Sequence, residues 1–277
     1  EVKKDEYRSF IKWEKLTKIP FIRGIFNFID SMVLGMKTLT YSASFYEEEE
    51  TSRVLTEEEA KKQEKKENVL MGITVAVSIV LAMGIFMVLP YFISGLFDKV
   101  ISSRFIKSVI EGLIRIAIFI GYILLISRMK DIQRVFMYHG AEHKCINCIE
   151  HGLPLTVENV RISSRQHKRC GTSFLFFVLA ISILLLMIVQ VESPLMRVVV
   201  RIALLPVIAG ISYEVLKLAG RSDNAVINFF SKPGLAIQKI TTKEPDDSMI
   251  EVAIQAVEAV FDWRTYEAEN FHVGEEL

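Results

Sequence analysis

The sequence predicts an all-α membrane protein: a polytopic helix bundle with about four transmembrane helices, an N-terminal interfacial helix and a cytosolic loop rich in His and Cys. Two uncharged apolar runs, Val69–Phe97 and Thr172–Val191, indicate membrane spans. Each is as long as the roughly 20 apolar residues that a helix needs to cross a bilayer core. The third observation is that Tyr138–Cys170 holds four of the five His and all three Cys.

The segment Ile19–Phe45 precedes the first span and is predicted to be amphipathic. Arg23, Asp30 and Lys37 recur every seven residues and form one polar stripe on an otherwise apolar helix. This suits a helix that lies in the membrane interface, or one whose stripe packs against the bundle. A fifth span is the alternative. The charged segment Glu47–Asn68 is expected to be a solvated surface helix or disordered.

Two further spans, Phe105–Ser127 and Met196–Leu218, are predicted from apolar runs that also carry charges. Glu111 and Arg115 lie four residues apart in the earlier of these two spans. Residues at this spacing share a helix face, so the two side chains are expected to pair.

The distribution of Lys and Arg predicts how the spans are oriented, because cytosolic loops are enriched in both. The connections near Lys99 and Glu192 hold few basic residues, whereas eight lie between the second and third spans: Arg128, Lys130, Arg134, Lys144, Arg161, Arg165, Lys168 and Arg169. Four spans then place both termini and the His/Cys loop in the cytosol of a multi-pass cell-membrane protein. That compartment is reducing, so the Cys residues are expected to be thiols or metal thiolates.

The chain is expected to divide into three parts. Residues 1–68 hold the interfacial helix and the charged segment, residues 69–218 the bundle with its loop at 128–171, and residues 219–277 a cytosolic helical region. In this last region Ser231–Asp247 is expected to be a turn-rich connector. An amphipathic helix from about Asp246 to Trp263 is expected to follow, with an apolar face of Ile250, Ile254, Val257 and Phe261 and an acidic face of Glu251, Gln255, Glu258 and Asp262.

The motif H-x-x-E-H at residues 139–143 has the spacing of a metal site. His139 and His143 are one helical turn apart, so both imidazoles can bind one ion. Glu142 lies between them, as in inverted zincins, where the Glu is a general base toward metal-bound water. This pattern predicts a metal with an open coordination position.

A second pattern overlaps the first. Cys145 and Cys148 form C-x-x-C, and His167 and Cys170 form H-x-x-C further along the chain. Two such pairs resemble a closed structural zinc site with four protein ligands. The residues alone leave both interpretations open. The H-x-E and P-C-x-x-C motifs of zinc deaminases do not occur here.

The stretch "YHGAEHKCINCIEHGLPLTVENVRISSRQHKRCGTSFL" closely resembles the signature of the YqhQ family of bacterial membrane proteins. Segments such as "IPFIRGI" and "RIALLPVIAGISYEVLKL" extend the resemblance from about Lys18 to Val257. Members share a domain of unknown function and are commonly labelled predicted metal-dependent enzymes. Family members usually begin with a Gly-rich segment like "GGQAVxEGVM", which is absent here, and the site is expected to be incomplete if that segment contributes to it.

The resemblance also implies site residues. The family pattern matches this sequence at His139, Glu142, His143, Cys148, Glu158, Asn159, His167, Cys170 and Gly171. Cys145 is not part of that pattern, which weakens the closed four-ligand interpretation. The expected metal ligands are therefore drawn from His139, His143, Cys148, His167 and Cys170, with Glu142 as the catalytic base.

The leading functional hypothesis is a zinc-dependent hydrolase that acts at the membrane surface. Zinc suits a ligand set of thiolate and imidazole. Membrane lipid is an expected partner, and four cations are candidates for binding an anionic lipid group, although the positive-inside bias alone accounts for them: Arg161, Arg165, Lys168 and Arg169. The balance of 33 basic and 33 acidic residues gives no argument for nucleic acid as a partner.

Two other classes of function remain. One is a non-enzymatic scaffold or membrane-protein biogenesis factor, with a structural metal and a protein client. The other is a small-solute transporter that uses Glu111 and Arg115. An open metal position beside Glu142 favours the enzyme, whereas four protein ligands favour the scaffold.

Overall fold

The computed structural model describes residues 19–47, 57–189, 193–221 and 224–271, together with residues 4, 6 and 191. Every regular element within these ranges is a helix. Four stretches are long and apolar enough to cross a membrane: Val69–Gly95, Phe105–Ile126, Gly171–Ile188 and Val199–Ala219. The prediction of an all-α bundle with about four such helices is confirmed.

The first span is built from α2 (Glu57–Met83), a π-helical turn (Gly84–Val88) and α3 (Leu89–Gly95). Pro90 follows the π turn closely. A proline has no N–H and crowds the carbonyl one turn earlier, and a wider turn relieves this conflict. The charged segment was expected to be either helical or disordered. From Glu57 onward it is helical, and the helix continues into the span without a break. The rest of the charged segment, residues 48–56, lies outside the described ranges.

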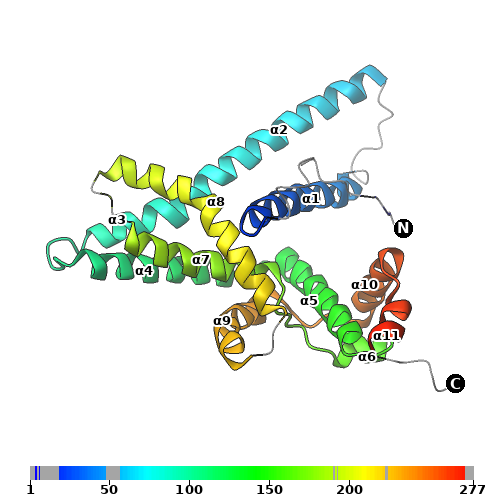
Figure 1. Ribbon diagram of the computed structural model, residues 1–277. Coiled ribbons are helices and arrows are strands. Elements are labelled where there is room, and N and C mark those ends of the chain that lie inside the picture. The colour runs from blue at the N-terminus through cyan, green and yellow to red at the C-terminus, as the bar shows by residue number, and fades with distance from the viewer. Residues whose placement is uncertain are drawn as a thin grey trace.

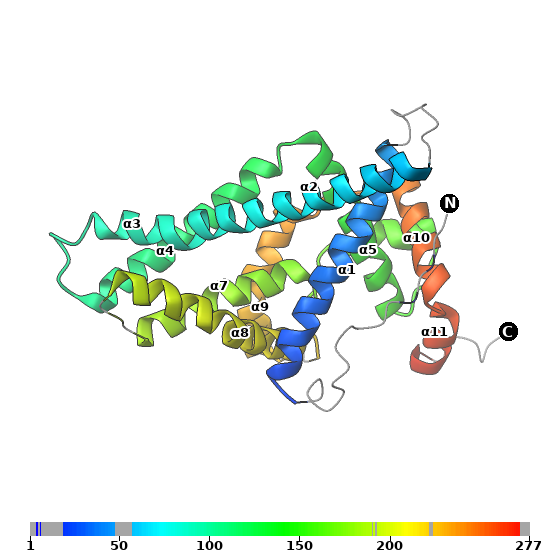
Figure 2. The ribbon, with the colours of Figure 1, turned by 90° about the horizontal axis from the view of Figure 1, so that it is seen from above.

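The other spans are α4 (Arg104–Ile126), α7 (Gly171–Ile188) and most of α8 (Pro194–Ala219). Serine side chains cap two of them: Ser103 Oγ accepts from Ile106 N, and Ser193 Oγ accepts from Met196 N. Figures 1 and 2 show the α3–α4 turn, the end of α7 and the start of α8 at one end of the bundle. The helices α5, α10 and α11 lie at the opposite end, as the predicted four-span topology requires.

Helix α1 (Ile22–Glu47) packs along α8. Arg23 Nε donates to Glu214 Oε1 at 2.6 Å, and Asn27 Nδ2 donates to Tyr213 Oη at 2.7 Å. The beginning of the polar stripe therefore faces the bundle, which was one of the two arrangements expected. Within the described residues α1 is not among the helices apolar enough to span a membrane, so the fifth span is not supported.

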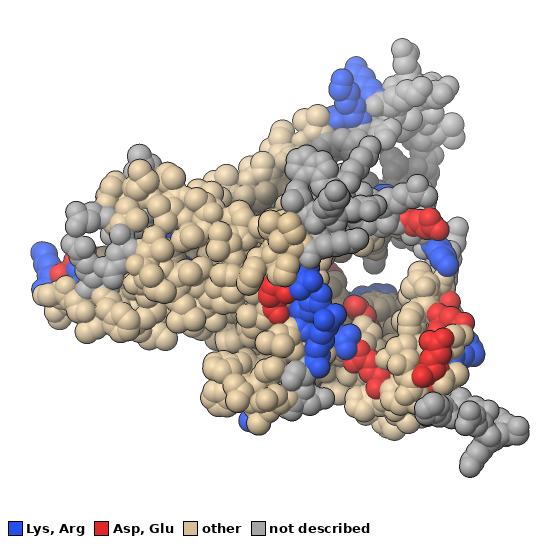
Figure 3. Space-filling view, in the orientation of Figure 1, with Lys and Arg blue, Asp and Glu red and all other residues tan. Residues whose placement is uncertain are grey.

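The connection between the second and third spans, predicted as a loop, is largely helical. It consists of α5 (Lys130–Glu150), the short α6 (Val157–Ile162) and an irregular segment that leads to α7. Figure 3 shows a broad uncharged surface over the spans, with charged side chains gathered where α5 and α10 lie.

The predicted C-terminal amphipathic helix is present as α10 (Asp247–Val260), with Asp246 as its N-cap. Ile250 is buried against α5, and Ile254 and Val257 pack on the same cluster. Phe261 follows the helix and is exposed, so it is not part of the buried face. Helix α11 (Trp263–Phe271) comes next, and the acidic face of α10 is exposed as predicted.

The expected turn-rich connector is wrong: most of Ser231–Asp247 belongs to α9 (Ala225–Thr241). Pro233 lies inside this helix and removes one backbone hydrogen bond. Gly234 packs tightly on α7, where an added Cβ would lie 3.0 Å from Ser173 Oγ. Packing of α9 on α7 thus overrides a Pro-Gly pair that by itself favours a turn.

The orientation of the bundle is testable with two exposed positions. We expect Ser103→Cys to react with a membrane-impermeant maleimide in intact cells, because it lies at the α3–α4 turn on the predicted outer side. Glu251→Cys on α10 should react only after permeabilisation. The three native cysteines are buried and give little background. The reverse labelling pattern would contradict the cytosolic placement of α5 and α10.

Candidate metal centre

Helix α5 and the start of α7 bring together His139, His143 and Cys170. One ligand atom from each residue lies within 4.8 Å of those of the others. The two imidazole rings are 4.3 Å apart, and His139 Nε2 is 3.2 Å from Cys170 Sγ. Cys170 is the N-cap of α7, and its sulfur accepts a hydrogen bond from Thr172 N at 3.3 Å.

Both imidazoles are hydrogen-bonded through Nδ1 to backbone carbonyls. His139 Nδ1 is 3.0 Å from the Thr241 carbonyl oxygen, and His143 Nδ1 is 2.8 Å from that of Arg165. A carbonyl only accepts, so each Nδ1 carries the proton and each Nε2 is available as a ligand. Metal-binding histidines are typically oriented in this way.

The donor set of two imidazole nitrogens and one sulfur fits zinc. It does not fit magnesium or calcium, which take oxygen ligands. With three protein ligands from the described part of the chain, a tetrahedral ion bound there would keep a fourth position for another ligand.

Gly140 allows the chain after α9 to approach α5 closely. A Cβ at this position would lie 2.1 Å from the Lys243 carbonyl oxygen, so no other residue fits without backbone movement. Lys243 N in turn donates to the Phe136 carbonyl at 2.9 Å. This contact keeps the Thr241 carbonyl beside His139. The sequence pattern drew attention to the residues on either side of Gly140 but not to Gly140 itself.

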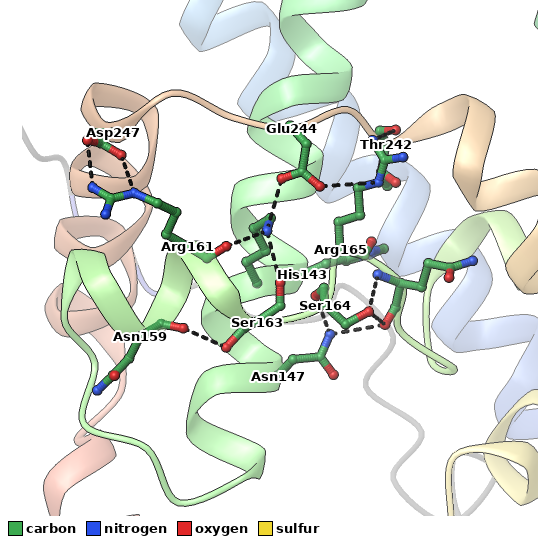
Figure 4. A network of polar contacts seen from close by, with 12 residues as sticks. His143, Asn147, Asn159, Arg161, Ser163, Ser164, Arg165, Thr242, Glu244 and Asp247 are labelled. Atoms are coloured by element: carbon green, nitrogen blue, oxygen red, sulfur yellow. Dashed lines mark hydrogen bonds and ion pairs between the residues drawn. The ribbon is translucent and has the colours of Figure 1, made fainter.

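A buried polar network holds the segment at residues 161–166 against α5 (Figure 4). Lys144 Nζ donates to the carbonyls of Arg161 and Ser163 at 2.9 Å each and pairs with Glu244 at 3.0 Å. Asn147 Nδ2 donates to the Ser164 carbonyl at 2.7 Å. These contacts position the Arg165 carbonyl that hydrogen-bonds His143. The only sequence signal for them was the i,i+3 spacing of Lys144 and Asn147 on one helix face.

His167 lies near the three-residue group but outside it. Its ring is 5.9 Å from that of His143, and its Nε2 is 3.0 Å from Glu150 Oε2. Its backbone N–H and carbonyl both hydrogen-bond the buried side chain of Gln238. His167 thus fixes the chain just before Cys170.

Cys148 and Cys145 lie in a different environment. Both are fully buried in an apolar cluster with Ile250 and Trp263, and Cys148 Sγ lies 3.3 Å from the Leu153 carbonyl. Burial raises the pKa of the Cys145 thiol to about 12 and also raises that of Cys148. Among the described residues, neither thiol joins a metal-capable group. The C-x-x-C and H-x-x-C pairs therefore do not form the closed four-ligand arrangement.

Cys170 is ionised more easily than a free thiol. Burial opposes its ionisation, but hydrogen bonds from both imidazoles and from Thr172 outweigh burial and lower its pKa to about 5. Burial lowers the pKa of His139, yet the hydrogen bond and charge of Cys170 raise it overall. Without a metal, the two residues therefore favour a thiolate–imidazolium pair. A metal ligand also has to be a thiolate.

Two further residues of the family pattern differ in accessibility and role. Glu142 is exposed on α5, and its charge contributes to the raised pKa of His139. Asn159 is structural, since its Nδ2 donates to the Pro154 carbonyl at 2.8 Å.

The four cations considered for anion binding all contact other parts of the protein. Arg161 forms a two-bond pair with Asp247, Arg165 lies near Glu244, Lys168 donates to Asn228, and Arg169 pairs with Glu150. These contacts explain the four cations as structural residues.

Comparison with known proteins identifies relatives without a known activity. Residues 19–263 match the family described as protein of unknown function (DUF1385). The uncharacterized protein YqhQ of Bacillus subtilis (strain 168) is 38% identical over 248 residues, which cover 86% of this chain and 76% of that protein. No solved structure matches the chain.

The ionisation of Cys170 gives a prediction for chelator-treated protein. We expect ultraviolet thiolate absorbance to appear with a midpoint near pH 5 and to be missing from Cys170→Ser. Since the pKa is lowered in the folded state, the thiolate adds stability above the ordinary thiol pKa, and this stability is lost as the pH falls through about 5. A midpoint near the ordinary value of 9.0 would contradict the hydrogen bonding described for Cys170.

Proposed function

The chain belongs to the YqhQ family, a family of unknown function (DUF1385), and on this premise we propose that it is a zinc-dependent hydrolase acting at the cytosolic surface of the membrane. One observation carries the proposal: two Nε2 atoms and one Sγ converge while both Nδ1 groups are already hydrogen-bonded. His139, His143 and Cys170 would hold the ion. Cys148 and His167 have other partners and are not included.

Each residue has a distinct role in the proposed reaction. A zinc ion held there would supply Lewis-acid chemistry and would lower the pKa of a coordinated water to about 7. Glu142, the residue before His143, is exposed and would accept the proton as general base. The Thr241 and Arg165 carbonyls keep both imidazoles in one tautomer and orientation.

The position of the site supports a substrate that approaches from the membrane surface. Cys170 directly precedes the span Gly171–Ile188, so the group lies where the bundle ends. Membrane lipid or a membrane-associated protein is the proposed substrate class. The four nearby cations already have protein partners and do not support a specific anionic headgroup.

A structural metal in a scaffold protein is the competing proposal. It would call for a fourth protein ligand, and none of the described His, Cys, Asp or Glu residues joins the group of three. The observed set therefore favours the enzyme.

Metal content and hydrolysis test the proposal together. Protein purified without a His tag should contain about one zinc ion per chain; His143→Ala should lose it, because a ligand is removed. Cys148→Ser is the matched control and should keep it. Glu142→Gln should keep the zinc yet lose hydrolysis of a panel of chromogenic esters and phosphates by about 100-fold or more, as expected for a general base.

Two results would contradict parts of this proposal. Folded wild-type protein without metal would make the group a hydrogen-bonded cluster. Zinc-loaded protein that hydrolyses none of the panel, or hydrolyses it equally well with Glu142→Gln, would favour the scaffold.

A further inference from the structure

A second polar group is buried among the spans, away from the metal centre. Glu111 and Arg115 on α4 and Arg201 on α8 are each at most 9% exposed. Glu111 Oε1 accepts from Arg115 Nη2 at 3.0 Å and from Arg201 Nη2 at 2.5 Å. The predicted Glu111–Arg115 pair is thus confirmed, and it includes a second arginine that the sequence pattern did not associate with it.

The group has more positive than negative charge. Two guanidinium groups share one carboxylate, which leaves one positive charge unbalanced among the described residues that bond to it. The remaining contacts are neutral: Arg115 Nη1 donates to Ser182 Oγ at 3.3 Å and Arg201 Nη1 to the Met87 carbonyl at 3.2 Å. Nε of each arginine is buried without an acceptor in the described part of the chain. An unbalanced charge at membrane depth is costly and typically marks a functional site.

Both arginines line a cavity of about 310 Å³. This volume lies within the range of small-ligand sites. Apart from the arginines, Ser182 and the Tyr122 ring, its walls are apolar and extend along α7 from Leu175 to Leu186. That length is about 16 Å at the rise of an α-helix.

The cavity opens sideways, on the lateral surface of the bundle. Three of its lining residues, Tyr122, Leu175 and Leu205, are 46%, 46% and 44% exposed. These side chains belong to spans, so the surface that they share would contact lipid chains in a bilayer. A ligand that enters there would be apolar over most of its length.

We infer that this cavity binds an anionic amphiphile, with its carboxylate or phosphate at Arg115 and Arg201 and its alkyl chain along the apolar wall of α7. The anion would balance the extra charge and provide acceptors for guanidinium donors, which form strong pairs with both groups. A long apolar cavity with cations in its wall matches such a ligand better than a small hydrophilic solute. The site is separate from the metal centre, since Ser182 lies about 18 Å along α7 from Cys170.

A displacement experiment identifies the ligand class. The full-length protein in a neutral maltoside detergent is loaded with cis-parinarate, a fluorescent fatty acid, and titrated with competitors. Oleate or lysophosphatidate should displace the probe, and the stronger of the two shows whether carboxylate or phosphate is preferred. Methyl oleate and lysophosphatidylcholine should displace it at least about tenfold less well. Equal displacement by methyl oleate would overturn the inference.

Charge variants test the role of the arginines. Arg201→Gln should weaken binding of cis-parinarate at least about tenfold, whereas Glu111→Gln, which increases the positive charge, should bind it as tightly or more tightly. A merely structural ion-pair group predicts damage from both changes. Unchanged binding by a folded Arg201→Gln protein would contradict the inference.

A variant at the cavity mouth keeps the test decisive if the charge variants do not fold. Leu205→Trp should narrow the mouth and weaken cis-parinarate binding, while Leu184→Trp, on an exposed part of α7 outside the cavity, should not. Equal binding by both would overturn the proposed site. Both should retain zinc, so failure of this inference is distinguishable from failure of the proposed enzyme.

Discussion

The candidate metal centre depends most on the hydrogen bonds made by the buried side chain of Gln238. Its Oε1 accepts from His167 N, and its Nε2 donates to the His167 carbonyl and to Ser173 Oγ. One amide from α9 thus fixes the chain on both sides of Cys170. Three residues after Gln238, the Thr241 carbonyl orients His139. Because Gln238 is fully buried, replacing it would leave these partners unsatisfied, and the ligands on α5 and α7 would lose their alignment.

The two polar sites satisfy different constraints. The candidate metal centre lies where α7 begins, so its histidines can bond backbone carbonyls from segments outside the spans. The arginine group lies within the spans and has fewer acceptors available, and it uses the Met87 carbonyl in the irregular first span. Helix α7 connects the two, with Cys170 at its N-cap and Ser182 on its inner face.

The sequence predicted the spans and the His139–His143 pair well, because both depend on local spacing and composition. It could not predict the carbonyls of Thr241 and Arg165, which approach from distant segments. Cys148 was grouped with the ligands because the family pattern includes it. In a continuous α5, at about 100° per residue, Cys148 lies about half a turn around the helix from His139 and faces the apolar core. The Pro233–Gly234 pair led to the wrong prediction of a turn, because the packing of α9 on α7, which local sequence does not reveal, favours a helix there.

The central claim is that His139, His143 and Cys170 form a metal site with one open position. X-ray absorption at the zinc edge of purified, zinc-loaded protein measures its coordination directly. The structure predicts two imidazole nitrogens at about 2.0–2.1 Å, one sulfur at about 2.3 Å and one further light atom from solvent. Two or more sulfur ligands, or none, would contradict this account of the site.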